Sequence, residues 1–396
     1  MNSYNERIDI LLSRIDRITL SKELLIPSLY IGDLGRVIYF SYRYLQTQEK
    51  EYSEACQSLL EELINNSNNY FLDSSLGTGL TGYCWTIQHL IDLGLLKPKE
   101  ITTVEDILPY LLNSIKQDFK RKDYDFIYGC LGKISCLSLL SPTKNIKNST
   151  VLAFLDKIKE KDGKGIFWRD VDRNDDVNLG IAHGMPSILL FLIDHYGKNR
   201  QVFNSFIEPG ISWLLAQRKK SGISSFPHCT LDAETDSRLA WCYGDLGISY
   251  LLLKAGNLYN NVEWYRFGYF VAQKASYRNI NNSGVYLNGD NYYYDTCFCH
   301  GTSGVAYLFS ALAEITNEPI IIKAKNNWLN INLENSEKHI DNFENLPKQD
   351  LTKEGELDSA FCQNIGLLEG VIGTALVLMH STNNNLNGWS KLFQIQ

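Results

Sequence analysis

Three short segments of the sequence carry residue types that bind metal ions. Each ends on the first glycine of a Gly-x-x-Gly sequence or of its close variant: Cys242 stands in AWCYG, Cys299 and His300 stand in CHG, and His183 stands in AHG. Two thiolates and one imidazole suit zinc, and three protein ligands leave a fourth tetrahedral position for water or a substrate. A Cys-His dipeptide alone is a weak signal, which Cys242 beside its own glycine pair strengthens. Cys297 competes with Cys299 as the ligand but lies further from the glycines.

These segments belong to a repeat that runs through the chain. Seven times, a polar loop leads into Gly-x-x-Gly or a close variant and then into an apolar run, at steps of 47 to 69 residues. The pairs begin at Gly32, Gly79, Gly129, Gly184, Gly244, Gly301 and Gly370. Only the fourth pair lacks its second glycine, which is replaced by Ser187. Such self-similarity is typical of folds that stack one structural unit many times.

The repeat predicts an all-α fold. The apolar runs after the glycines predict buried inner helices, and amphipathic stretches such as 51–66 and 103–120 predict outer helices. Because an open array would expose the inner helices, we expect a closed α/α toroid of seven inner and seven outer helices, forming a single domain over residues 1–396. The glycine-rich loops should gather at one end, bringing the cysteines and histidines together. Segments 163–178, 280–296 and 333–358 are polar and less regular, and we expect excursions or strands there.

Composition excludes several classes of protein. Apolar residues make up 44% of the chain and charged residues 21%, as in ordinary globular proteins. A net charge of −7 argues against binding nucleic acid electrostatically. No signal peptide and no apolar run of about 20 residues is found, so we expect a cytoplasmic protein without a transmembrane segment. Nine cysteines, an odd number, predict reduced thiols, and we interpret six as inert filler: Cys56, Cys84, Cys130, Cys136, Cys229 and Cys362.

The ordered motifs AWCYG, CHG and AHG among Gly-x-x-Gly repeats resemble the lanthipeptide cyclase (LanC) family, over roughly Ser28 to His380. The resemblance implies the same toroid and one zinc ion on two cysteines and one histidine. It also implies addition of peptide cysteine thiols to dehydroalanine or dehydrobutyrine. The metal ligands carried over are Cys242, Cys299 and His300, and the further site residues are His183, Asp125, Arg238 and Tyr243.

In this interpretation zinc activates the thiol, and His183 passes a proton to the enolate formed by the attack. Asp125 would orient His183, while Arg238 or Tyr243 would stabilise the enolate oxygen. Purely structural roles stay open for three of these neighbours. Tyr243 and Trp241 could pack the inner ring, and Arg238 could be a helix cap or a structural ion-pair partner. The resemblance implies a dehydrated precursor peptide with its leader as the partner. A complex with a dehydratase and an exporter, with peripheral attachment to the membrane, remains an option.

Three other functions were weighed. A glycosidase on a related toroid would need two facing carboxylates, for which Asp33 and Asp245 are the candidates, but it would leave the cysteines and histidines unexplained. Zinc-dependent thiol prenyl transfer would need a basic cluster that the loops lack. A zinc protein of the same fold could bind glutathione or peptides without cyclising them. His183 and Asp125 favour catalysis over binding alone.

Overall fold

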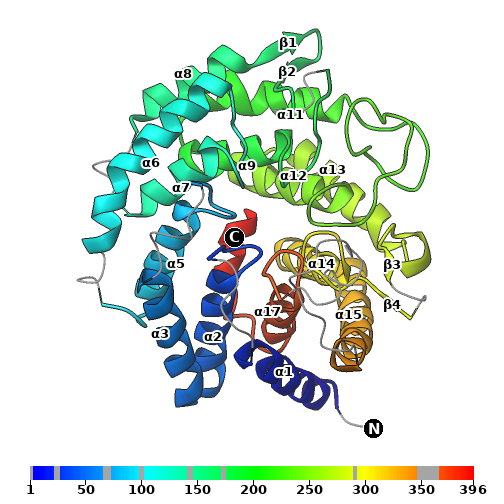
Figure 1. Ribbon diagram of the computed structural model, residues 1–396. Helices are drawn as coiled ribbons and strands as arrows, with labels where there is room; N and C mark the ends of the chain where they lie inside the picture. Colours follow the sequence, from blue (N-terminus) through cyan, green and yellow to red (C-terminus); the bar gives the residue numbers. More distant parts are fainter. Residues whose placement is uncertain are drawn as a thin grey trace.

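The computed structural model describes residues 3–21, 27–65, 73–97, 102–140, 146–170, 175–288, 292–345 and 365–396. Within these residues the helices form two concentric rings (Figure 1). The inner ring comprises α2 (Asp33–Thr47), α5 (Leu80–Asp92), α7 (Cys130–Leu140), α9 (Met185–Tyr196), α12 (Asp245–Tyr259), α14 (Thr302–Thr316) and α17 (Val371–Thr382). Each inner helix contacts the next, and α17 contacts α2, so the ring is closed.

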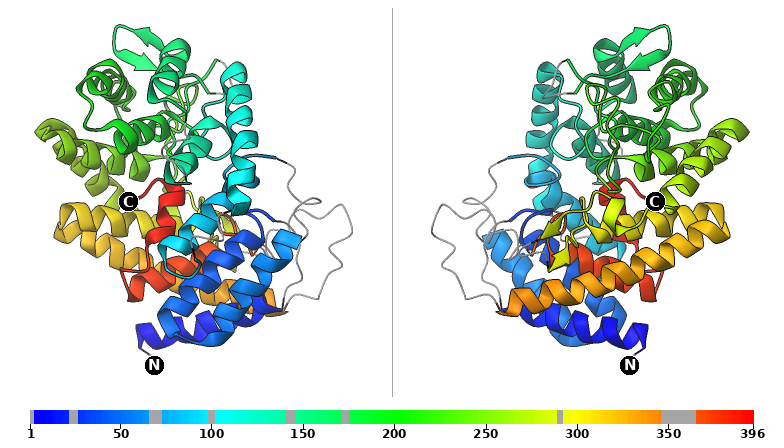
Figure 2. Two further views of the ribbon diagram at one scale, coloured as in Figure 1. Left: turned by 90° about the vertical axis from the view of Figure 1, so that its left-hand side faces the viewer. Right: turned by 90° about the vertical axis from the view of Figure 1, so that its right-hand side faces the viewer.

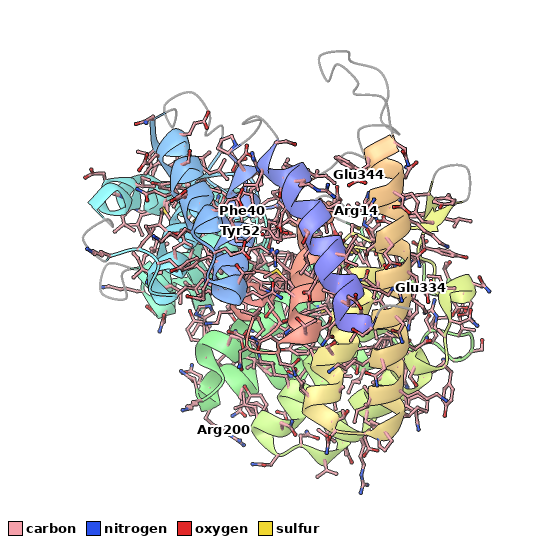
Figure 3. All side chains as sticks on the ribbon, turned by 90° about the horizontal axis from the view of Figure 1, so that it is seen from below. Arg14, Phe40, Tyr52, Arg200, Glu334 and Glu344 are labelled. Atoms are coloured by element: carbon pink, nitrogen blue, oxygen red, sulfur yellow. The ribbon has the colours of Figure 1, made fainter. Side chains whose placement is uncertain are left out.

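The outer ring surrounds the inner one. It comprises α1 (Tyr4–Leu20), α3 (Lys50–Asn65), α6 (Thr102–Arg121), α8 (Asn148–Ile158), α11 (Glu208–Leu215), α13 (Val262–Ser276) and α15 (Pro319–Asn345). A short helix, α10 (Arg200–Val202), and a π-helix, η2 (Phe203–Ile207), lead into α11. Helix α1 lies against α15 and α17, and the Arg14–Glu344 ion pair (2.6 Å) links it to α15 (Figure 3). The predicted all-α toroid of seven inner and seven outer helices is confirmed.

The two rings differ in sequence because they differ in what covers them. In α9, ten of twelve residues are buried, since its neighbours enclose nearly its whole circumference. In α3 the buried residues Tyr52, Cys56, Leu59, Leu60 and Leu63 recur at helical spacing and form one stripe that faces the inner ring. Among the described residues, no helix is long and apolar enough to cross a membrane.

The 3₁₀-helix η4 (Gly388–Phe393) fills the centre of the ring (Figures 1 and 2). Tyr30 donates its hydroxyl to the Leu392 carbonyl at 2.6 Å, and the Trp241 indole donates to the Phe393 carbonyl at 3.0 Å. The Phe393 ring lies 4.0 Å from that of Phe298, centroid to centroid. The loops of the first, fifth and sixth repeats are therefore anchored on one central segment, which fixes their relative positions.

A common turn shapes four of the glycine-rich loops. The residues that make it are Asp73, Asp123, Asn178 and Asp295, each six positions before the first glycine of its repeat. In each, Oδ1 accepts a hydrogen bond from the backbone N–H two residues on, and the carbonyl accepts one from the first helical residue. Such Asx turns satisfy backbone groups that a loop would otherwise leave unpaired. They hold each loop in a defined shape above its inner helix.

The second glycine of a pair allows the loop to lie directly on the helix. A Cβ built on Gly132 would lie 1.9 Å from the Phe126 carbonyl oxygen, and one on Gly304 would lie 2.0 Å from that of Phe298. Any side chain would force the loop away from the helix. In the fourth repeat Ser187 takes this place, and its buried hydroxyl donates to Gln394 Oε1 at 2.8 Å. Ser187 thus replaces the second glycine and contacts the residue that directly follows η4.

The three irregular segments have different outcomes. Strands β1 (Glu160–Asp162) and β2 (Gly165–Phe167) form an antiparallel hairpin in register Glu160 to Phe167, within and just before 163–178. Segment 280–296 contains a 3₁₀-helix η3 (Ile280–Asn282) and the hairpin of β3 (Leu287–Asn288) and β4 (Tyr293–Tyr294). Residues 171–174, 289–291, 346–358 and Cys362 lie outside the described residues.

The expectation for segment 333–358 is wrong over residues 333–345, which continue helix α15. Its polar residues resemble a loop, but several face inward. Asn332, one residue earlier, accepts hydrogen bonds from Thr302 and Ser303, and His339 Nδ1 lies 2.8 Å from the Thr296 hydroxyl. These buried polar contacts hold the loop and the first helical turn of the sixth repeat. The polar residues on the inner face of α15 are therefore compatible with burial, because they are hydrogen-bonded there.

The buried ring of His89 should make the stability of the fold decrease at acidic pH. Its ring is buried between inner helices, 3.0 Å from the Tyr42 hydroxyl and stacked on Trp85, and burial lowers its pKa to about 3. The unfolded chain, with a histidine pKa near about 6.5, binds the proton first, so this contribution to stability is complete above about pH 6.5 and is lost towards pH 3. Between pH 8 and 5 we expect a loss of about 2 kcal/mol from His89.

Urea unfolding of wild type and His89→Gln at both pH values measures this loss. The variant should be less stable at pH 8 but should lose less on acidification. The two proteins losing stability equally between pH 8 and 5 would contradict the prediction.

Candidate metal centre

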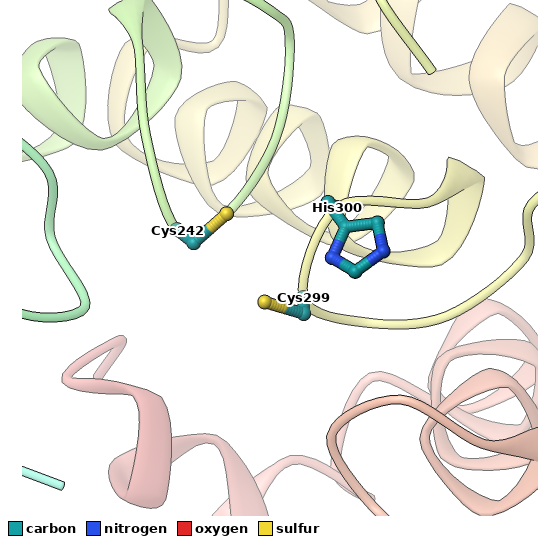
Figure 4. A group of neighbouring side chains, drawn as sticks. All are labelled: Cys242, Cys299 and His300. Carbon is teal, nitrogen blue, oxygen red and sulfur yellow. The ribbon is translucent and has the colours of Figure 1, made fainter. Parts of the chain in front are cut away.

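The loops before α12 and α14 bring two thiols and one imidazole together. The Trp241 and Cys242 N–H groups donate to the Cys299 carbonyl at 3.2 and 3.1 Å, so the two loops are directly joined. The Cys299 N–H in turn donates to the Leu368 carbonyl in the loop of the seventh repeat, at 3.0 Å. The ligand atoms of Cys242, Cys299 and His300 all lie within 4.8 Å of one another (Figure 4). The three side chains that the sequence analysis named as metal ligands therefore lie close together.

The two thiols influence each other's protonation. The hydrogen bond with Cys299, opposed by burial, lowers the pKa of Cys242 below its usual value. The same contact, together with burial, raises the pKa of Cys299 well above it. The two thiols therefore do not titrate independently, and a metal ion bound to both would replace their protons. The donor set of two sulfurs and one nitrogen fits zinc.

Cys297, the alternative thiol, has a different environment. It is 2% exposed, and its sulfur accepts a hydrogen bond from the His300 N–H at 3.5 Å. Burial and the charge of Asp295 raise its pKa well above the usual value. It forms a second group of possible ligand atoms with Asp295 and His300. Cys299 is more exposed and joins a thiol from another repeat, so we retain Cys299 as the candidate ligand.

His183 is bonded to a carboxylate from the neighbouring repeat. Its Nδ1 lies 2.6 Å from Asp125 Oδ2, while Asp125 Oδ1 accepts the N–H groups of Ile127 and Tyr128, both at 2.8 Å. Burial alone would lower the pKa of His183, but the hydrogen bond and charge of Asp125 outweigh it, and the pKa is raised. The half-exposed Tyr128 ring stacks on the imidazole at 6.0 Å. The arrangement suits a histidine that exchanges protons near neutral pH.

Asp125→Asn should lower the pKa of His183. Asparagine keeps the oxygen that accepts the two backbone N–H groups but removes the negative charge beside the imidazolium. We expect the pKa of His183 to fall, because a negative charge close to an imidazolium favours its protonated form. Nuclear magnetic resonance titration of the His183 ring, assigned with His183→Ala, measures it, and the ring of His195 on α9 serves as the internal control. An unchanged His183 pKa would mean that Asp125 does not stabilise the imidazolium.

A cavity of about 570 Å³ is lined in part by Tyr243, the residue that follows Cys242 in the chain. It is lined by His183, Arg238 and Tyr243 together with carboxylates, which are Asp123, Asp125, Asp170, Asp176 and Asp232. Cys242 is the residue before Tyr243 in the chain, and its thiol interacts electrostatically with the His183 ring. The structure therefore brings the four predicted auxiliary residues to one cavity beside the thiols.

Arg238 and Tyr243 both have structural partners. The Arg238 guanidinium lies over the Tyr286 ring at 5.0 Å and donates to its hydroxyl at 3.2 Å. The Tyr243 hydroxyl accepts a hydrogen bond from Asn178 Nδ2 at 3.3 Å, and burial raises its pKa. Both side chains remain part of the cavity wall, so a role in packing and a role towards a substrate are compatible.

Sequence reasoning missed three neighbours of the two histidines. Asp295 Oδ2 lies 3.2 Å from His300 Nε2, Tyr286 meets the His300 ring edge-on at 5.9 Å, and Tyr128 covers His183. Asp295 could have been found from its fixed distance to the glycine pair. Tyr286 directly precedes the β3–β4 hairpin, and no motif of the repeat marks this position in the sequence.

The carboxylates required by a glycosidase are engaged elsewhere. Asp33 is 1% exposed and pairs with Arg36 at 2.6 Å, and Asp245 is fully buried and accepts the N–H groups of Ser225 and Phe226. Neither lines the cavity. The acidic lining also lacks the basic cluster that diphosphate binding needs for prenyl transfer.

The sequence pattern of the lanthionine synthetase C-like protein family matches residues 24–394. The chain belongs to this family. The solved structure of a nisin cyclase superposes on this lanthionine synthetase C-like chain with a TM-score of 0.70 at 19% identity, covering 98% of this chain and 96% of that one. This likeness shows that the two share a fold.

A curated relative, glutathione S-transferase LANCL1 of Danio rerio, is 28% identical over 144 residues. The match covers 36% of this chain and 32% of that protein, so the chain spans about a third of the length of the curated relative it matches.

Proposed function

We propose that this chain is a zinc-dependent peptide cyclase that forms lanthionine and methyllanthionine in the biosynthesis of a lantibiotic. The observation that carries the proposal is the meeting of Cys242, Cys299 and His300 within 4.8 Å, beside a cavity that contains the Asp125–His183 pair. Membership of the lanthionine synthetase C-like family and the fold shared with a nisin cyclase support it.

The metal ligands would be Cys242, Cys299 and His300. A zinc ion held there would supply a Lewis acid that lowers the pKa of an incoming peptide thiol and leaves it as a nucleophilic thiolate. The protein sulfurs suit this task because they are soft ligands, and three ligands fall one short of the usual four. The half-buried Cys299 lies at the accessible side of the group.

The residues of the cavity would handle the proton. Attack of the thiolate on the β-carbon of a dehydroamino acid forms a carbon–sulfur bond and breaks the carbon–carbon π bond, leaving an enolate. We assign His183 as the acid that protonates the α-carbon, and Asp125 as the residue that holds the imidazole by Nδ1. Arg238 or Tyr243 would stabilise the enolate oxygen. The thiol proton is lost and a proton is gained, so the peptide mass does not change.

The proposed substrate is a dehydrated precursor peptide with its leader, which a separate dehydratase would supply in the cytoplasm. A complex with that dehydratase and with an exporter, and attachment to the membrane through it, form part of the proposal. No contact with nucleic acid is proposed, because the cavity is lined by five carboxylates and one arginine.

Incubation of the zinc-loaded protein with a dehydrated, cysteine-containing peptide tests the function. Mass spectrometry after thiol alkylation should show loss of free thiol at unchanged peptide mass. Protein treated with a chelator, and then the same protein with zinc restored, are the controls. Ring closure at the same rate in the zinc-free and zinc-loaded protein would refute the zinc-dependent mechanism.

The same assay separates the cyclase from a zinc protein that binds glutathione or peptides without cyclising them. A curated relative is named a glutathione S-transferase, so glutathione is added to a second reaction. A cyclase closes the ring within the peptide even when glutathione competes. A binding protein retains the peptide or glutathione but leaves its free thiol available for alkylation.

A further inference from the structure

Two histidines occupy equivalent positions in the glycine-rich loops of the fourth and sixth repeats. His183 and His300 each directly precede the first glycine of their repeat, and each follows an Asx-turn residue by five positions, Asn178 and Asp295 respectively. In both turns Oδ1 accepts the N–H two residues on at 2.8 Å. The two loops therefore have the same pattern of backbone hydrogen bonds. The two histidines differ in the side chains that surround them.

At His300 the turn residue itself contacts the ring. Asp295 Oδ2 lies 3.2 Å from Nε2, and its side chain is only 3% exposed, so water competes little for this contact. An ionised carboxylate only accepts hydrogen bonds, so the Nε2 facing it carries the proton. The Nδ1 atom then presents its lone pair, and Figure 4 shows this side of the ring facing the sulfurs of Cys242 and Cys299.

At His183 the arrangement is reversed. Asn178 directs its amide nitrogen to Asp170 Oδ2 at 3.1 Å and to the Tyr243 hydroxyl at 3.3 Å. Asp125 from the neighbouring repeat contacts Nδ1 at 2.6 Å instead. The nitrogen of His183 that remains for a substrate is Nε2.

We infer that Asp295 is the positioning residue that makes His300 a metal ligand through Nδ1, and that asparagine at the equivalent position 178 leaves His183 to act in proton transfer. The inference rests on the proposed zinc function. The same turn thus serves two purposes in the fourth and sixth repeats, and whether its side chain presents an oxygen or a nitrogen decides between them.

Asp295→Asn is the direct test. Asparagine keeps the oxygen that accepts the Cys297 N–H, as Asn178 does in its own loop. Its NH₂ group would face Nε2 and donate to it, which places the ring proton on Nδ1, where the metal must bind. We expect zinc affinity to fall about 10- to 100-fold in competition with a chromophoric chelator. In a cobalt(II) titration, sulfur-to-cobalt absorption should appear only at higher metal concentration.

Asp73→Asn is the matched control. Asp73 makes the same turn in the second repeat, where its Oδ1 accepts the Ser75 N–H at 2.7 Å and its Oδ2 accepts the Thr78 hydroxyl at 2.7 Å. Its variant should bind zinc as wild type does. Equal zinc affinity of wild type and Asp295→Asn overturns this inference alone, whereas a wild-type chain that binds no zinc overturns the proposed function together with it.

A measurement on the unaltered protein keeps the inference testable if Asp295→Asn does not fold. Nitrogen-15 spectra of the zinc-loaded wild type should show His300 with a protonated Nε2 and a metal-bound Nδ1. The opposite assignment, metal on Nε2, overturns the inference.

Discussion

Replacing Cys242 with alanine is expected to remove zinc from the protein and to slow ring closure on the order of 1000-fold. The side chain is 5% exposed and supplies one of the two sulfurs of the proposed ligand group. Loss of a ligand should weaken zinc binding by more than the about 100-fold that loss of an outer hydrogen-bond partner causes. Without the several kcal/mol of Lewis-acid stabilisation, the peptide thiol remains largely protonated.

Metal content by mass spectrometry and the rate of thiol loss measure the two effects. Cys84→Ala is the control, because this thiol is fully buried in α5 and burial raises its pKa to about 12. Cys297→Ala separates the two possible ligand groups around His300. If Cys297→Ala lost zinc and Cys242→Ala kept it, the ligand set proposed here would be wrong.

The toroid could be predicted because its determinants are local and repeated. A second glycine lets a loop lie directly on its inner helix, as at Gly132 and Gly304, and a helix enclosed on all sides is apolar all round. The same reasoning did not predict the structure of residues 333–345, which continue helix α15. There polar residues face inward to hold a loop, so hydrophobic periodicity could not distinguish the helix from a connection.

The candidate metal ligands could be predicted because cysteine and histidine beside a glycine pair have little packing reason to be there. The grouping then followed from the expected convergence of the loops. Asp295 was accessible in principle, since Asp73 and Asp123 stand at the same distance from their glycines. Tyr286 was not, because its contact with His300 depends on the β3–β4 hairpin, which lies outside the repeated pattern of glycines and apolar runs.

His183→Ala is expected to retain zinc and to lose turnover by about 10²- to 10⁴-fold, the range that a positioned acid or base contributes. The ring contacts Asp125 and Tyr128, and it is not part of the group formed by Cys242, Cys299 and His300. Zinc content and thiol alkylation, measured on the same sample, separate this result from that of Cys242→Ala.

His228→Ala is the control that shows whether the hydrogen bond to Asp125 distinguishes His183 from another histidine of the cavity. His228 lines the same cavity, but burial and the charge of Arg238 lower its pKa, so little of it is protonated at neutral pH. Its loss should slow the reaction far less than the loss of His183. Equal rates for the His183 and His228 variants would place the proton donor elsewhere. Zinc loss in His183→Ala would instead make that residue part of the metal site, because a pure proton donor is dispensable for binding the ion.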